Sequence, residues 1–176
     1  MPTQKAQKPY KLYRNISIFV LTAAVLASAW IFLFKDTTAT TTDTAFVNEV
    51  VTLTNNDRKS AGLPALTVNK KLSDAAYAKA LDMIKNNYFA HVSPTGKTPW
   101  VWMEAENYNY IYAGENLAIN FKTPEATETA WMNSPSHKEN IMSKNYKEIG
   151  IAEAQGVING QPTIVVVEMF GTEVTY

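Results

Sequence analysis

Two histidines, His91 and His137, carry most of the chemistry open to the side chains of this 176-residue sequence. The chain has no cysteine, which excludes disulfides, thiol catalysis and cysteine-based zinc or iron–sulfur sites. An imidazole can act as a general base, as a metal ligand or as a hydrogen-bonding group that holds a ligand. Whether the fold brings the two histidines together decides which of these roles they can share.

The two histidines lie in different local patterns. His91 opens the stretch HVSPTGKTP, whose proline, glycine and serine predict a loop. His137 follows Ser134 and Pro135, and serine followed by proline is typical of a helix start. The positive end of that helix favours a neutral His137, which suits a metal ligand or a base and equally a packed structural histidine. Ser134 is either the N-cap of this helix or a nucleophile that His137 activates.

The elements that must position these residues are read from the spacing of apolar side chains. A helix is expected from residue 45 up to the SAGLP stretch, and a second from an N-cap at Ser73 through residue 87. Residues 100–106 predict a short helix, and Thr123 with Pro124 begins another. KEIGIAEA and TIVVVEMFG are strand-like and are joined through Asn159 and Gly160, a pair that favours a type I′ turn. The fold class is therefore α+β with an antiparallel hairpin.

Aromatic and polar side chains add three narrower expectations. The tryptophans are expected in the core, with sugar-binding platforms as the alternative: Trp100, Trp102 and Trp131. Three tyrosines alternate along the chain and are expected to share one exposed face of a strand: Tyr108, Tyr110 and Tyr112. Asn55 and Arg58 in the first helix are expected to tie loops to that helix.

Residues 16–34 form an uncharged and largely apolar run. A helix of this length spans about 28 Å, close to the hydrocarbon thickness of a bilayer. Lys5, Lys8, Lys11 and Arg14 precede the run and only Lys35 follows it, so residues 1–15 are expected in the cytoplasm and the rest outside. The run predicts an uncleaved single-pass signal anchor in the cell membrane. The alternative is secretion after signal cleavage, because ASA at residues 27–29 resembles a cleavage site.

Charge is distributed unevenly along the chain. Residues 1–35 carry five Lys or Arg and no acid, whereas residues 36–176 carry eleven Lys or Arg against sixteen Asp or Glu. An acidic body without a Lys/Arg cluster argues against nucleic-acid binding, which requires phosphate neutralisation. Residues 35–44, KDTTATTTDT, are interpreted as a threonine-rich linker between the membrane and a domain over residues 45–176.

Several stretches, taken in order, resemble one family. NNDR with AGLPAL, HVSPTGKTP, AGENLA, AWMNSPSHKENIM and EIGIA are similar in order and spacing to bacterial members of the CAP superfamily. This superfamily, also called SCP-like, includes cysteine-rich secretory proteins, insect venom antigens and plant pathogenesis-related proteins. The resemblance covers residues 46–171. It implies an α-β-α sandwich with a three-stranded antiparallel sheet between helical layers and a cleft on one side.

The resemblance also implies a site. Eukaryotic members line the cleft with two histidines and two glutamates that can hold a divalent metal, and here His91 and Glu115 match the first of each. The second glutamate falls on Ser134, and the second histidine falls in KEIGIA, which has none. His137 is the available substitute, one helical turn beyond Ser134. The expected cleft residues are therefore His91, Glu115, Ser134 and His137, and the expected metal ligands are His91, Glu115 and His137.

Three functions follow from this interpretation. The first is a membrane-anchored extracytoplasmic domain whose cleft binds a lipid, an envelope glycan, a peptide or a divalent metal such as zinc. The second is a hydrolase, in which a metal-bound water, or Ser134 activated by His137, attacks a peptide or ester bond. The third is a structural envelope protein with a vestigial cleft.

Overall fold

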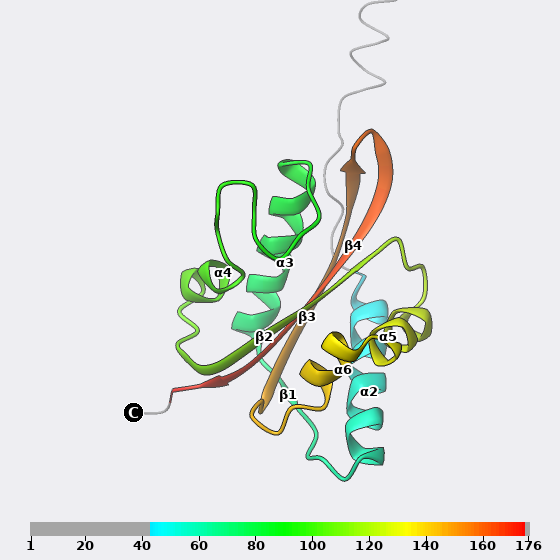
Figure 1. The fold of residues 1–176 in the computed structure, drawn as a ribbon, viewed down its shortest axis with the longest axis vertical. Coiled ribbons are helices and arrows are strands. Elements are labelled where there is room, and N and C mark those ends of the chain that lie inside the picture. The colour runs from blue at the N-terminus through cyan, green and yellow to red at the C-terminus, as the bar shows by residue number, and fades with distance from the viewer. Residues whose placement is uncertain (1–42, 175–176) are drawn as a thin grey trace, which may run out of the picture. The chain divides into compact units, whose positions relative to one another are not determined.

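A four-stranded sheet forms the centre of the computed structural model, which describes residues 43–174 (Figure 1). The strands follow the order β1-β3-β4-β2 across the sheet. Their bounds are Thr67–Val68 for β1, Tyr110–Ile119 for β2, Glu148–Ile158 for β3 and Gln161–Glu173 for β4. Strand β4 pairs antiparallel with both β2 and β3, whereas β1 pairs parallel with β3.

The fold is mixed α+β, as predicted, but the expectation of a three-stranded antiparallel sheet is wrong by one strand. Strand β1 has two residues and is joined to the rest of the sheet by hydrogen bonds from Thr67 N to Lys147 O and from Asn69 N to Ile149 O. A strand of two residues has no alternation of apolar and polar side chains, so its sequence carries no strand signal. The β3–β4 hairpin turns at Asn159 and Gly160, which both have positive φ, as the sequence predicts.

Helices lie on both sides of the sheet (Figure 1). Their bounds are Thr44–Ser60 for α2, Lys70–Lys85 for α3, Trp100–Ala105 for α4, Pro124–Asn133 for α5 and Pro135–Ile141 for α6. Helix α5 begins with Thr123 as N-cap and Pro124 in its first turn, as predicted. Helix α2 has Asp43 as its N-cap, so Asp43 and Thr44 belong to the helix start and not to the linker.

Helix α3 begins earlier in the chain than predicted, so the expectation that Ser73 is its N-cap is wrong. The cap is Asn69, whose side chain accepts a hydrogen bond from Lys71 N at 2.9 Å. Asn69 is held in an extended conformation because its own N–H pairs with β3. Asparagine caps helices as well as serine does, and here the sheet contact decides between them.

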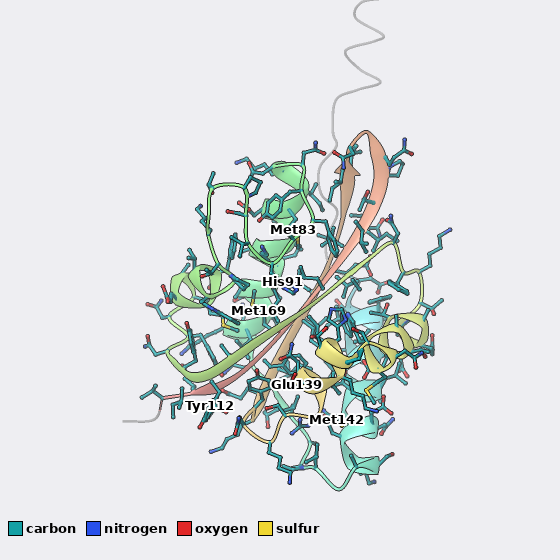
Figure 2. The ribbon with its side chains drawn as sticks, in the orientation of Figure 1. Met83, His91, Tyr112, Glu139, Met142 and Met169 are labelled. Atoms are coloured by element: carbon teal, nitrogen blue, oxygen red, sulfur yellow. The ribbon has the colours of Figure 1, made fainter. Side chains whose placement is uncertain are left out.

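Two hydrophobic clusters lie on the two faces of the sheet, because successive strand residues point to opposite sides. On β4, Val167 and Met169 pack against α3 and α4, whereas Val166 and Phe170 pack against α2, α5 and α6. Figure 2 labels Met83 and Met169 of the first cluster, and Met142, which packs on the second.

The aromatic residues divide between core and surface. Trp131 and Trp102 are buried, which confirms the core expectation for both, and Trp100 is half-buried against the first cluster. The expected exposed face of three tyrosines is wrong: Tyr108 is fully buried and donates its hydroxyl to Glu148 at 2.7 Å, whereas Tyr112 is exposed. Strand β2 starts only at Tyr110, and its register shifts there, so the three residues do not share one strand face.

The predicted N-terminal segments lie outside the described residues. These are the basic tail at residues 1–15, the signal anchor at residues 16–34 and most of the linker at residues 35–44. Within residues 43–174, none of the helices is both long enough and apolar enough to cross a bilayer.

Candidate functional site

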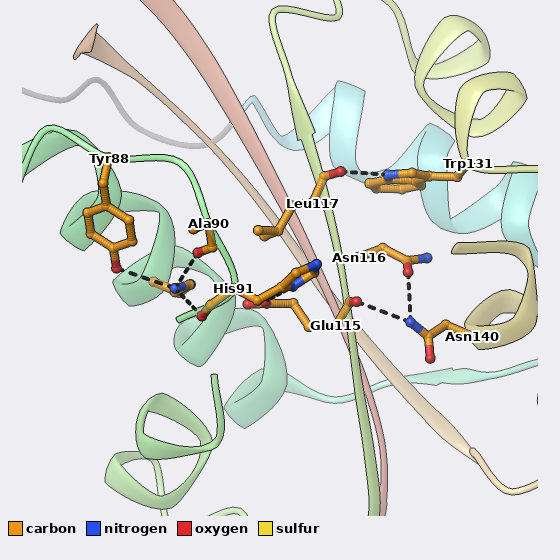
Figure 3. A network of polar contacts seen from close by, with 9 residues as sticks. Tyr88, Ala90, His91, Glu115, Asn116, Leu117, Trp131 and Asn140 are labelled. Carbon is orange, nitrogen blue, oxygen red and sulfur yellow. Dashed lines mark hydrogen bonds and ion pairs between the residues drawn. The ribbon is translucent and has the colours of Figure 1, made fainter. Parts of the chain in front are cut away.

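A carboxyl–imidazole pair joins His91 to Glu115 (Figure 3). Nδ1 of His91 lies 2.6 Å from Oε1 of Glu115. Glu115 comes from β2 and its side chain is 2% exposed, whereas His91 comes from the loop after α3 and its side chain is 54% exposed. When the ring is neutral and Glu115 is ionised, this contact places the proton on Nδ1 and leaves Nε2 as an acceptor. Among the described residues, no hydrogen bond engages Nε2.

The charge state of Glu115 is set by opposing effects. Burial raises the pKa of Glu115, while the hydrogen bond with His91 and the positive charge of Lys79 lower it. Its second oxygen, Oε2, is buried and has no hydrogen-bond partner in the part of the chain that the structure describes. The pair therefore consists of a fixed, buried carboxyl and a half-exposed imidazole that it orients.

Lys79 of α3 contacts the loop that carries His91. Its ammonium donates hydrogen bonds to the backbone oxygens of Ala90 at 3.0 Å and His91 at 2.8 Å, and to the Tyr88 hydroxyl at 3.3 Å (Figure 3). The ammonium also lies 4.4 Å from the centre of the Trp102 ring, which favours a cation. Lys79 is fully buried, and burial lowers its pKa. These bonds hold the loop in the position that brings His91 to Glu115.

The sequence indicates that Lys79 is buried, but a search for apolar spacing alone does not find it. Lys79 lies four residues before Met83, which faces the core, so it occupies an inward position of an otherwise apolar helix face. A lysine at such a position is rarely buried without partners. The partners are three oxygens in the loop that begins after α3, which the helical pattern cannot reveal.

Helix α6 brings His137 near this pair. Burial, and then the charge of nearby His91, lower the pKa of His137. No hydrogen bond joins the two imidazoles within the described part of the chain. Asn140 of α6 donates to Glu115 O at 3.1 Å and to Asn116 Oδ1 at 2.9 Å, which fastens α6 to β2 (Figure 3). Asn116 also donates to His137 O at 3.2 Å.

Ser134 occupies the N-cap position of α6, but its side chain makes no capping hydrogen bond. Its hydroxyl lies 3.4 Å from that of Ser136. Among residues 43–174, no hydrogen bond joins Ser134 to His137, and no carboxyl accepts a bond from the His137 ring. The arrangement lacks the contacts that would activate Ser134 as a nucleophile.

The residues of the expected metal site do not fit a metal centre. Within residues 43–174, no three Asp, Glu or His side chains converge in an arrangement that could hold a metal ion. Nδ1 of His91 is already engaged by Glu115. The positions of the family's remaining two ligands hold Ser134 and a strand without histidine. The fold therefore assembles the pair of His91 and Glu115 and not a set of three ligands with His137.

Asn116 also contacts a second polar cluster, which consists of Thr54, Glu128 and Glu168. Asn116 donates to Glu168 Oε2 at 2.9 Å, and the Thr54 hydroxyl lies 3.2 Å from Glu168 Oε1 and 3.0 Å from Glu128 Oε2. A hydroxyl has one proton to donate, so satisfying both contacts requires a proton on one of the two carboxyls. Burial raises the pKa of Glu128 to about 7 and that of Glu168 well above its usual range. No pattern in the sequence indicates that these glutamates are buried together.

Raising the pH from 5 to 8 is expected to lower the free energy of unfolding by about 2 to 3 kcal/mol. Glu128 has a pKa of about 7 in the folded protein, well above that of an exposed glutamate. Between these values the folded state binds more protons than the unfolded state, so stability falls as pH rises. Urea denaturation at each pH measures how the free energy of unfolding changes with pH. Glu128→Gln should make this change smaller, and an unchanged pH dependence in the variant would contradict the raised pKa of Glu128.

Comparison of the sequence and the fold with known proteins identifies the family. The chain belongs to CAP, the cysteine-rich secretory protein family, whose family model matches residues 51–169. The resemblance to bacterial members is confirmed by a relative in Bacillus subtilis (strain 168), the uncharacterized protein YkwD. It is 43% identical over 115 residues, which are 65% of this chain and 45% of YkwD. The uncharacterized membrane protein YlbC of the same organism is 30% identical over 103 residues, which are 58% of this chain and 30% of YlbC.

Solved structures support the same family. An extracellular protein containing an SCP domain from Bacillus anthracis str. Ames has a TM-score of 0.64 at 27% identity, covering 73% of this chain and 41% of that one. An outer surface protein from Borrelia burgdorferi shares the fold with a TM-score of 0.62 at 23% identity, covering 71% of this chain and 90% of that one. The matched region is less than half the length of the curated relatives.

Proposed function

We propose that this protein is a membrane-anchored, extracytoplasmic CAP domain that binds a ligand at the pair of His91 and Glu115. The observation that carries the proposal is the half-exposed His91 ring held by a carboxyl whose side chain is 2% exposed. Lys79 holds the loop of His91 through a hydrogen bond to the His91 backbone oxygen, so the ring is oriented before any ligand arrives. Such preorganisation lowers the entropy that binding costs.

The free Nε2 of His91 favours a ligand that offers hydrogen-bond donors. Envelope glycans and peptides carry hydroxyl and N–H groups, whereas the acyl chain of a lipid carries none. A divalent metal would need further ligands beyond this pair. The proposed ligand class is therefore a glycan or a peptide of the cell envelope, and lipid and metal are the alternatives that the experiment separates.

The two histidines permit a direct test on the full chain in lipid nanodiscs, because histidine-selective ¹⁵N labelling yields signals from only two imidazoles. The probes are N-acetylglucosamine oligomers, an alanine-containing tetrapeptide, a short-chain phospholipid and Zn²⁺. We expect the glycan or the peptide to shift the Nε2 signal of His91. Glu115→Gln should weaken that response, whereas Glu104→Gln, at an exposed position in α4, should not. If none of the probes moves the His91 signal in the wild-type protein, the proposal fails.

The membrane location has support of its own. The uncharged run at residues 16–34 follows four basic residues, one relative is named a membrane protein, and one solved neighbour is an extracellular protein. We expect the full chain to stay in the membrane fraction after carbonate extraction, because an uncharged, largely apolar helix of about 19 residues spans the bilayer. Recovery of a soluble form that begins at Trp30 would show signal cleavage instead.

One observation favours hydrolysis as a second candidate function. A carboxyl that holds the Nδ1 side of an imidazole is the arrangement that orients a general base in hydrolases. Nε2 of His91 would take a proton from water as that water attacks the carbonyl carbon, and would return it to the leaving amine or alcohol when the peptide or ester bond breaks. Water is the nucleophile in this step because no hydrogen bond joins Ser134 to either imidazole in the described part of the chain. Turnover of peptide and ester substrates by the full chain, abolished in His91→Gln, would support this function. Binding without turnover would leave only the first proposal.

A further inference from the structure

A hollow of about 320 Å³ lies between α2 and α5. Three acidic residues line it: Asp57 from α2, and Glu125 and Glu128 from α5. Leu53 and Met132 supply apolar wall. We call this hollow the α2–α5 pocket. It is near the lower limit of size for a small-molecule site.

The carboxyls of the α2–α5 pocket form no ion pair with a Lys, Arg or His within residues 43–174. Glu128 is 4% exposed, and its Oε1 has no hydrogen-bond partner within residues 43–174. When Glu128 is ionised, this buried oxygen without a donor is costly, and a ligand that brings an N–H group would remove that cost.

We propose that the α2–α5 pocket binds an alkylammonium group, carried either by a free amine or by a lysyl side chain of a peptide. An ammonium can donate an N–H group to Glu128 and keep its other donors for a neighbouring carboxyl or water, without all three carboxyls meeting at one point. The aliphatic stem next to it would lie along Leu53 and Met132. A divalent metal ion fits less well, because no three acidic side chains in the described part of the chain are arranged to hold one. This site is independent of the pair of His91 and Glu115.

Binding at this pocket competes with a proton. Glu128 is faced by Thr54 and Asp57 from α2 and by Glu168 from β4, and Glu125 lies one turn away on its own helix. With Glu128 half-protonated near pH 7, an amine must displace that proton, while the amine itself keeps its charge up to about pH 10. Binding is therefore expected to be about tenfold tighter at pH 8 than at pH 6.

The experiment is isothermal titration of the full chain in lipid nanodiscs, with empty nanodiscs as the blank. The probes are pentylamine and Nα-acetyl-lysine methylamide, which represent the two sources, and 1-pentanol is the neutral match. We expect at least one of the two amines to bind and pentanol not to bind. Glu128→Gln and the exposed Glu125→Gln should each weaken binding about tenfold or more, and Glu104→Gln should have no effect.

Each outcome decides the proposal. Binding by one amine alone supports it and identifies the source. The proposal is overturned if neither amine binds, if pentanol binds as well as pentylamine, or if binding survives both Glu128→Gln and Glu125→Gln in variants whose circular dichroism is native. Competition by Mg²⁺ at equal concentration would also overturn it, because it would indicate a metal site.

Discussion

Replacing Trp131 with alanine is expected to lower the free energy of unfolding by about 3 to 5 kcal/mol. Trp131 is 1% exposed, and its indole N–H donates to Leu117 O at 3.0 Å (Figure 3). The other buried residues of α5 are Thr127 and Glu128, so Trp131 is the one large apolar side chain that this helix buries. Its removal leaves both a cavity and an unpaired carbonyl. Guanidinium denaturation of the two proteins measures the difference.

Trp131→Phe is the matched control, because it keeps most of the ring volume but removes the N–H donor. Trp131→Phe should lower the free energy of unfolding by less than Trp131→Ala does, and the difference between the two variants measures the cost of the cavity. A loss below about 1 kcal/mol for Trp131→Ala would show that the residue is not part of the core. A sugar-binding platform would then be the better interpretation of this tryptophan.

Arg58→Met is expected to cost about 2 to 4 kcal/mol of folding free energy. The Arg58 guanidinium is fully buried and donates to Pro64 O at 3.0 Å, Ile141 O at 2.7 Å and Ser143 O at 2.8 Å. Methionine fills a similar volume but donates nothing, so these carbonyls lose their donor. The release of a buried charge, whose pKa burial lowers, offsets part of that cost.

Two control variants separate the hydrogen bonds of Arg58 from its charge. Lys59→Met removes a charge from the exposed neighbouring position and should change stability by less than about 0.5 kcal/mol. Arg58→Lys keeps the charge, but an ammonium cannot reproduce the planar fork that spans these oxygens, so it should recover only part of the loss. Equal urea midpoints for Arg58→Met and Lys59→Met would contradict the role given to Arg58.

The parts of the fold that local signals specify could be predicted from the sequence. Thr123 with Pro124 begins a helix, and Asn159 with Gly160 closes a hairpin, because each pair acts through backbone geometry that needs no distant partner. Strand β1 could not be predicted, since its two residues are strand only because β3 lies beside them. Asn55 and Arg58 tie loops to α2, as expected, although Arg58 also reaches α6, which no local pattern indicates.

The site was predictable only in part, for a similar reason. Family resemblance pointed to His91 and Glu115, and the fold joins them. Lys79 and Glu168 were missed because each is a charged residue within an apolar pattern, and their partners come from other elements. Burial of a charge depends on tertiary contacts, which the periodicity of a single element does not contain.

The strand order β1-β3-β4-β2 also bears on the order in which the molecule folds. Strands β3 and β4 are neighbours in the chain and meet through a tight turn, whereas β2 reaches β4 across α5, α6 and β3. Local contacts form first because closing a longer loop costs more entropy. The hairpin is therefore expected to gain amide protection before β2 in pulse-labelled hydrogen exchange, and simultaneous protection would contradict this. Because Glu115 lies on β2, a chain that refolds is expected to form the β3–β4 hairpin before it joins Glu115 to His91.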